Sequence, residues 1–128
     1  MSDIMGDGRS SKFVVVHFGY LIREEHMNIA VLAWEHNKGP DTPVLLRYID
    51  DWTHVLASFP RGASEELRHD VTQRLNEIKT YGDYQKVLDR MGPYTPFEFT
   101  DERASTATPE SVLESMSKFF LAPYDRAV

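Results

Sequence analysis

The 128-residue chain contains no cysteine. A disulfide, a thiolate metal site and a cysteine nucleophile are therefore excluded, and the absence suits a protein of a reducing compartment. No apolar run reaches the roughly 18 residues of a membrane-spanning helix, because the polar tetrad 23–26 interrupts the longest one. Residues 1–12 lack the basic-then-apolar pattern of a signal peptide. We therefore expect a cytoplasmic protein with no membrane partner.

Positive charge is also scarce. The chain has 14 Lys and Arg against 20 Asp and Glu, which gives a net charge of −6. No cluster of more than two basic residues occurs along the sequence. Proteins that bind nucleic acid usually carry a basic patch, so nucleic acid is not the partner that we expect. An acidic surface suits solubility, or docking to a partner with a basic surface.

The short motifs of common catalytic and cofactor sites are missing as well. The sequence contains no phosphate-binding loop, no dinucleotide fingerprint and no nucleophile elbow. Its five histidines show none of the spacings typical of a metal site. Adjacent carboxylates at 24/25, 50/51, 65/66 and 101/102 are typical of solvated turns and helix starts. We expect no cofactor and no metal, and these absences favour a non-enzymatic function while leaving catalysis open.

What the chain does contain is enough patterned apolar sequence for one α+β domain. Short segments rich in β-branched and aromatic residues predict strands at 12–22, 27–35, 44–49 and 96–100. Apolar residues at helical spacing predict helices at 52–59, 64–81, 83–91 and from Pro109 to before Pro123. Residues 101–107 are expected to form a polar loop.

This order of elements predicts an antiparallel-rich sheet of about four strands, of which the first two form a hairpin, covered by helices. The domain is expected to span 12–123, with a disordered tail at 1–11 and a second tail at 124–128. In the last helix, Thr108 is the expected N-cap. Its expected buried face consists of Val112, Leu113, Met116, Phe119 and Phe120.

The first hairpin is expected to pair Ile22 with Met27 across the polar tetrad. In that register, alternation makes one face continuously apolar and the other face mixed. The core face would carry Val14, Val16, Phe18, Tyr20 and Ile22 opposite Met27, Ile29, Val31 and Ala33. The mixed face would carry Phe13, Val15, His17, Gly19 and Leu21 opposite Asn28, Ala30, Leu32, Trp34 and His36.

On that mixed face, Gly19 would lie opposite Ala30 and leave a shallow spot. A glycine inside a strand marks a bulge or the close approach of another group. The spot is either covered by a tightly packed helix, or it is the floor of a groove bordered by His17, Asn28 and the hairpin tip. Asparagine is a poor strand former. We therefore predict that Asn28 ties the loop backbone through hydrogen bonds, with a ligand contact as the alternative.

The segment Arg23-Glu24-Glu25-His26-Met27-Asn28-Ile29-Ala30-Val31 resembles a pattern typical of the DUF3037 family, R-x-E-[FH]-x-N-[VI]-[GA]-V. Ala30 stands where that family usually has glycine. The C-terminal part is similar too, through Phe97-Glu98-Phe99-Thr100 and the helix from Pro109 to Pro123, so that the resemblance covers 12–123. His17-Phe18-Gly19 departs from the pattern, since a basic residue in the first strand is common in the family.

DUF3037 members are small bacterial and phage-borne proteins, often encoded beside HipA-like kinase genes. The resemblance therefore implies an accessory or regulatory protein with a protein partner. The candidate binding residues are His17, Gly19, Arg23, Glu25, His26 and Asn28.

Our leading interpretation is a non-enzymatic interaction or regulatory module that binds a protein partner through the first hairpin and the mixed sheet face. A homo-oligomer is a second kind of partner that we consider. The alternative is a nucleic-acid or nucleotide-acting enzyme that uses Glu25, His26 and Asn28. A nucleic-acid or small-ligand binder without catalysis is a third hypothesis.

Overall fold

The computed structural model describes residues 10–18, 27–53, 64–92, 95 and 97–121. Its elements are β1 (Ser11–Phe18), β2 (Met27–Glu35), β3 (Val44–Tyr48), α3 (Ser64–Asn76), α4 (Tyr81–Arg90), β4 (Phe97–Phe99), β5 (Arg103–Ser105) and α5 (Pro109–Leu121). All the strand pairs are antiparallel, which confirms the predicted α+β class. None of the described helices is long and apolar enough to cross a membrane.

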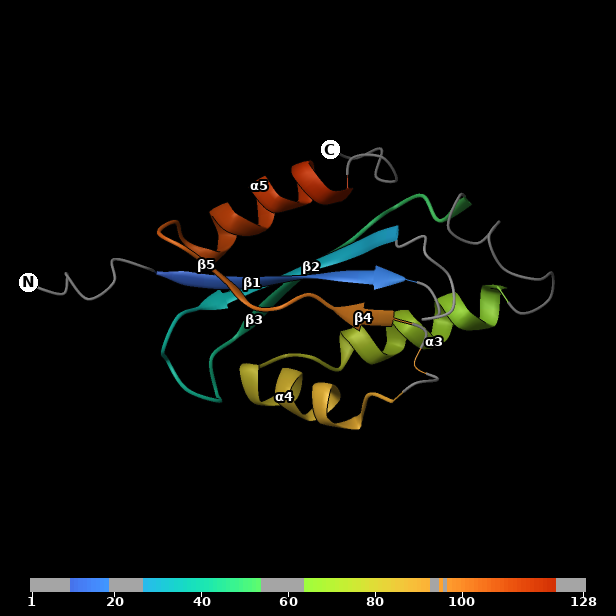
Figure 1. The fold of residues 1–128 in the computed structure, drawn as a ribbon, viewed down its shortest axis with the longest axis horizontal. Helices are drawn as coiled ribbons and strands as arrows, with labels where there is room; N and C mark the ends of the chain where they lie inside the picture. Colours follow the sequence, from blue (N-terminus) through green and yellow to red (C-terminus); the bar gives the residue numbers. More distant parts are fainter. Residues whose placement is uncertain (1–9, 19–26, 54–63, 93–94, 96, 122–128) are drawn as a thin grey trace, which may run out of the picture.

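The sheet has the strand order β3-β2-β1-β4, and β5 pairs with the other end of β1. β4 and β5 therefore form one interrupted edge strand along β1 (Figure 1). At the interruption, the Thr100 N–H donates to the Val15 carbonyl and the Val15 N–H donates to the Thr100 hydroxyl, both at 2.9 Å. The prediction of a polar loop at 101–107 was wrong for Arg103–Ser105, because pairing with β1 and not local apolar pattern makes this segment a strand.

Helices cover both faces of the sheet, α5 on one and α3 with α4 on the other (Figure 1). The rings of Trp34 and Tyr84 lie 5.1 Å apart and join β2 to α4. Val14 and Val15 point to opposite faces by strand alternation, and they are 0% and 1% exposed. The expectation of one core face and one mixed face was therefore wrong, since both faces belong to the core.

The hairpin register also differs from the prediction. Phe18, and not Ile22, lies opposite Met27, and Val16 lies opposite Ala30. The ladder is irregular between Val16 and His17, where one extra residue of β2 is accommodated. Both strands are apolar on both faces, so alternation alone could not select the register. The predicted Gly19–Ala30 floor does not form, because Val16 occupies the place opposite Ala30.

A local hydrogen-bond pattern divides the predicted helix 64–81. Thr80 caps α4: its hydroxyl accepts from the Asp83 N–H at 3.2 Å, and the Asp83 carboxylate accepts from the Thr80 N–H at 3.1 Å. This reciprocal capping box starts a new helix after α3 ends at Asn76. Gly82 separates the two predicted helices 64–81 and 83–91, where it was expected to break or bend the helix. It lies instead in the first turn of α4, where its N–H donates to the Pro40 carbonyl at 2.8 Å.

The last helix begins as predicted, with the Thr108 hydroxyl accepting from the Ser111 N–H at 3.2 Å. Its buried residues are Val112, Ser117 and Leu121, and Phe120 is half-buried. Phe119 is 75% exposed, so its predicted place on the buried face was wrong. At this end of α5 the face turned to the core carries Ser117, Phe120 and Leu121, and Phe119 lies outside it.

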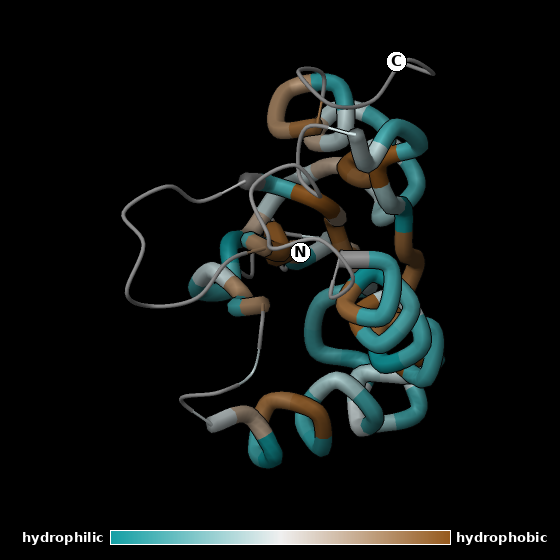
Figure 2. Tube along the Cα trace, turned by 90° about the vertical axis from the view of Figure 1, so that its right-hand side faces the viewer, coloured by the Kyte–Doolittle hydropathy of each residue, from teal (hydrophilic) through white to brown (hydrophobic). Residues whose placement is uncertain are grey.

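The ends of the predicted domain can be compared only in part. Residues 1–9 and 122–128 lie outside the described residues, but Ser10 and Ser11, expected in the tail, belong to the sheet region. The Ser11 hydroxyl is fully buried and donates to the Ala107 carbonyl at 2.8 Å. Along the helices, hydrophilic and hydrophobic stretches alternate (Figure 2), as expected for helices that pack one face on a sheet.

Candidate functional site

The base of the first hairpin holds two of the predicted site residues in contact. The Asn28 side chain donates from Nδ2 to the Phe120 carbonyl at 3.2 Å, so its Oδ1 faces His17. The Asn28 Oδ1 lies 2.8 Å from the His17 Nδ1, which places the ring proton on Nδ1. Asn28 therefore joins β1, β2 and the end of α5, and its contacts here are structural.

The other predicted site residues cannot be placed. Gly19, Arg23, Glu25 and His26 lie outside the described residues, and so does the hairpin tip as a whole. The enzyme alternative depends on Glu25 and His26, and the structure therefore provides no geometry for it. Of the predicted cluster, the structure describes His17 and Asn28, and it brings these two together.

An exposed aromatic residue precedes Phe120, whose carbonyl accepts the Asn28 hydrogen bond. Phe119 and Phe120 are neighbours in the last turn of α5, with ring centroids 4.8 Å apart. The end of α5 lies over the end of the sheet at which β1 finishes and β2 begins (Figure 1). Phe120 packs against the core while Phe119 projects outward. We call the region formed by His17, Asn28 and Phe119 the hairpin surface.

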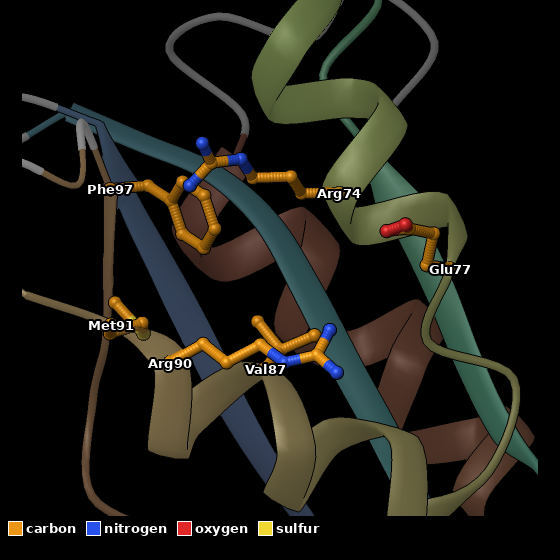
Figure 3. A pocket seen from close by; sticks show the side chains of 6 residues that line it. All are labelled: Arg74, Glu77, Val87, Arg90, Met91 and Phe97. Carbon is orange, nitrogen blue, oxygen red and sulfur yellow. The ribbon is translucent and has the colours of Figure 1, made fainter.

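On the opposite face of the sheet, α3, α4 and β4 enclose a cleft of about 310 Å³. We call it the arginine cleft; it is lined by Arg74, Glu77, Val87, Arg90, Met91 and Phe97. Arg74 reaches from α3 toward the Phe97 ring, and Arg90 extends beside Val87 (Figure 3). The Arg74 Nε also lies 3.3 Å from the Asp70 Oδ1, one helical turn earlier.

A third polar cluster ties the sheet to α4. The Glu102 carboxylate lies 3.4 Å from the Lys12 Nζ and accepts a hydrogen bond from the Tyr81 hydroxyl at 3.1 Å. Burial, and then the neighbouring Glu102, raise the pKa of Tyr81 above its ordinary value. The phenol therefore stays protonated at neutral pH and acts as a donor, not as a base. The cluster borders a smaller cleft of about 180 Å³.

Among the described residues, no group of three or more His, Asp or Glu side chains is arranged to hold a metal ion. Tyr81 and Tyr84, two aromatic residues around Gly82, pack on Trp34 with centroids 5.3 and 5.1 Å from its ring. Tyr84 belongs to the buried core, and Tyr81 is partly buried and lines the smaller cleft.

Two features of these sites were not predicted from the sequence. The apolar spacing of α5 does not signal the exposure of Phe119, because adjacent residues such as Val112 and Leu113 can both pack against the core. The arginine cleft combines side chains of α3, α4 and β4, and no spacing in the sequence signals it.

The chain was compared with models of protein families, with curated proteins and with solved structures, and none matches it. The resemblance to the DUF3037 family therefore stays a prediction.

Proposed function

We propose that this protein is a non-enzymatic interaction module that binds a protein partner through the hairpin surface. The observation that carries the proposal is the exposure of Phe119. Its side chain is 75% exposed, the largest value among the large hydrophobic residues that the structure describes as exposed. A buried aromatic anchor surrounded by polar groups is the usual centre of a protein interface.

The surroundings of Phe119 suit an anchor that is rigid before binding. The last turn of α5 is tied to β2 through the Asn28–Phe120 hydrogen bond. Phe120 and Leu121 pack against the core beneath it. Binding therefore requires little ordering of the backbone that presents the ring, which lowers the entropic cost of association.

The polar residues of the segment between β1 and β2 also belong to the proposed surface. The segment that connects β1 to β2 contains Arg23, Glu25 and His26, which we assign to its polar rim. The proposal uses this hairpin and the end of α5, and no longer an open sheet face, because helices cover both faces. With a net charge of −6, the protein is best suited to a partner with a basic surface.

The resemblance to DUF3037 proteins narrows the kind of partner that we propose. It supports an accessory role beside a HipA-like kinase, or in a phage and host system, with both proteins in the cytoplasm. A second copy of this chain is the competing partner, and it would show as self-association in the absence of other proteins.

The test is affinity capture from a lysate of the source cells with the wild-type chain, Phe119→Ser and Leu88→Ser as bait. Leu88 is the matched control, because it is a 44% exposed aliphatic residue on α4, across the sheet from α5. We expect quantitative mass spectrometry to find a protein that the wild type and Leu88→Ser retain equally and that Phe119→Ser loses at least about tenfold.

Equal recovery by all three baits would refute the hairpin surface as the docking site. Both substituted side chains are largely exposed, so we expect melting temperatures close to that of the wild type. Size-exclusion chromatography of the purified chain tests whether the partner is a second copy of this chain. A wild-type dimer that becomes a monomer in Phe119→Ser would show that it is.

A further inference from the structure

We propose that the arginine cleft is a binding site for a small organic acid with one carboxylate and an apolar body. The cleft is walled by the last turn of α4, by the end of α3 and by β4. The two helices that wall it, α3 and α4, lie across the sheet from α5, which carries Phe119 (Figure 1). The two proposals therefore concern different residues and can fail separately.

The charged residues around the cleft favour a ligand with a negative charge. Arg74 and Arg90 contribute two positive charges, and Glu77 contributes one negative charge. Arg74 already has a carboxylate partner in Asp70. No ion pair of Arg90 is found among the residues that the structure describes. A guanidinium with its donors available binds a carboxylate through paired hydrogen bonds.

The same balance limits the ligand to a single negative charge. The Glu77 side chain stands across the cleft from Arg90 (Figure 3). A second acidic group on the ligand would be brought toward this carboxylate and repelled by it. An amide or hydroxyl on the ligand, in contrast, could donate to Glu77.

The apolar residues that line the cleft favour an apolar body for the rest of the ligand. Val87 and Met91 are half-buried and present their side chains to the cleft between the charged groups (Figure 3). Phe97 also lines the cleft and is fully buried. About 310 Å³ lies at the lower end of the range for small-molecule sites, which run from roughly 300 to 1,000 Å³. A ring or a branched chain fits this space better than a long polymer.

The first experiment uses 3-phenylpropanoate as the probe, with 3-phenylpropanamide as its uncharged match. Both are titrated into the full-length protein carrying ¹³C-labelled methionine methyl groups. We expect the acid to shift the Met91 methyl signal in a saturable manner. We expect the amide to bind at least about tenfold more weakly, because its single neutral carbonyl oxygen replaces a carboxylate that pairs with the guanidinium through two oxygens. The affinity for the acid should also fall as salt is raised.

The second experiment compares Arg90→Gln with Arg103→Gln. Arg103 is an exposed arginine on β5 that does not line the cleft, so its variant controls for the loss of one positive charge. We expect Arg90→Gln to weaken binding of the acid about tenfold and to weaken binding of the amide much less, while Arg103→Gln binds both as the wild type does.

Three results would overturn the proposal. The first is an amide that binds as tightly as the acid, and the second is equal affinities of the two arginine variants for the acid. The third is an unshifted Met91 signal at about 10 mM acid, a concentration above the millimolar dissociation constant of even a weak small-molecule complex. If Arg90→Gln failed to fold, the comparison of acid with amide in the wild type would still decide.

Discussion

Asn28 is a polar residue in a strand whose neighbours Ile29, Ala30 and Val31 are fully buried. Its amide satisfies two groups at once, the His17 ring and the Phe120 carbonyl. The carbonyl belongs to the last turn of α5, where helix carbonyls have no partner within the helix. The Asn28 side chain therefore holds β1 at the irregular part of the hairpin and also binds the last turn of α5.

We expect Asn28→Ala to lower the free energy of unfolding by about 2 kcal/mol, because two partly buried hydrogen bonds are lost together. Gln73→Ala, at an exposed position on α3, serves as the control and should change stability little. Urea unfolding followed by circular dichroism measures both. A pair of variants with the same midpoint would show that the Asn28 contacts do not stabilise the fold.

At the scale of elements, α4 is defined by its first turn. The backbone N–H of Lys79 donates to the Asp83 carboxylate at 3.1 Å and holds the pKa of Asp83 below its ordinary value, with further help from Thr80. A carboxylate also interacts favourably with the positive end of a helix. Local hydrogen bonds thus decide where α3 ends and α4 begins, although the apolar pattern runs through the junction.

The lowered pKa makes the contribution of Asp83 depend on pH. Because the folded-state pKa lies below the unfolded value of about 3.9, the stabilisation is fully present at higher pH and is lost as the pH falls through the folded-state value. We expect Asp83→Asn to be less stable than the wild type at pH 7, and the difference to shrink toward pH 2.

Urea titrations at several pH values would measure this difference. Asp89→Asn is the control on the same helix, since Asp89 is exposed and does not take part in the capping box. A gap between Asp83→Asn and the wild type that stayed constant from pH 7 to pH 2 would contradict the assignment. Thr80→Ala, which removes the other half of the capping box, should cost about 1 kcal/mol at pH 7.

At the scale of the whole molecule, the sheet is buried on both sides. Val14 faces the side of α3 and α4, since its neighbour in alternation, Val16, pairs with Phe99, whose ring lies 5.1 Å from that of Tyr84. Val15 points the other way, toward α5. Helices on both faces explain why β1 and β2 are almost continuously apolar.

This arrangement predicts that Val14→Thr and Val15→Thr have similar effects. Each places a hydroxyl in a fully buried position at nearly constant volume, so each should cost about 1–3 kcal/mol. Thermal or urea unfolding measures the two side by side. If one variant were close to the wild type in stability while the other was not, one face of β1 would have to be open to water.

The candidate site could be predicted from the sequence only in part. Asn28 stood out in the sequence, because asparagine is rare in strands and its neighbours are apolar. Its partner Phe120 is 92 residues away in the chain, and nothing local indicates that contact. Arg74 and Arg90 look like ordinary exposed helix residues until Phe97 and Met91 are placed between them.

The sequence by itself determined what depends on near neighbours in the chain: the class of the fold, most of the strands and helices, and the start of α5 at Thr108 and Pro109. Caps and periodicity act over a few residues, so they can be read from the chain. Only the tertiary structure decided the hairpin register, the pairing of β5 with β1, the burial of both sheet faces and the exposure of Phe119. These depend on contacts between distant segments, and several registers satisfy the same apolar pattern.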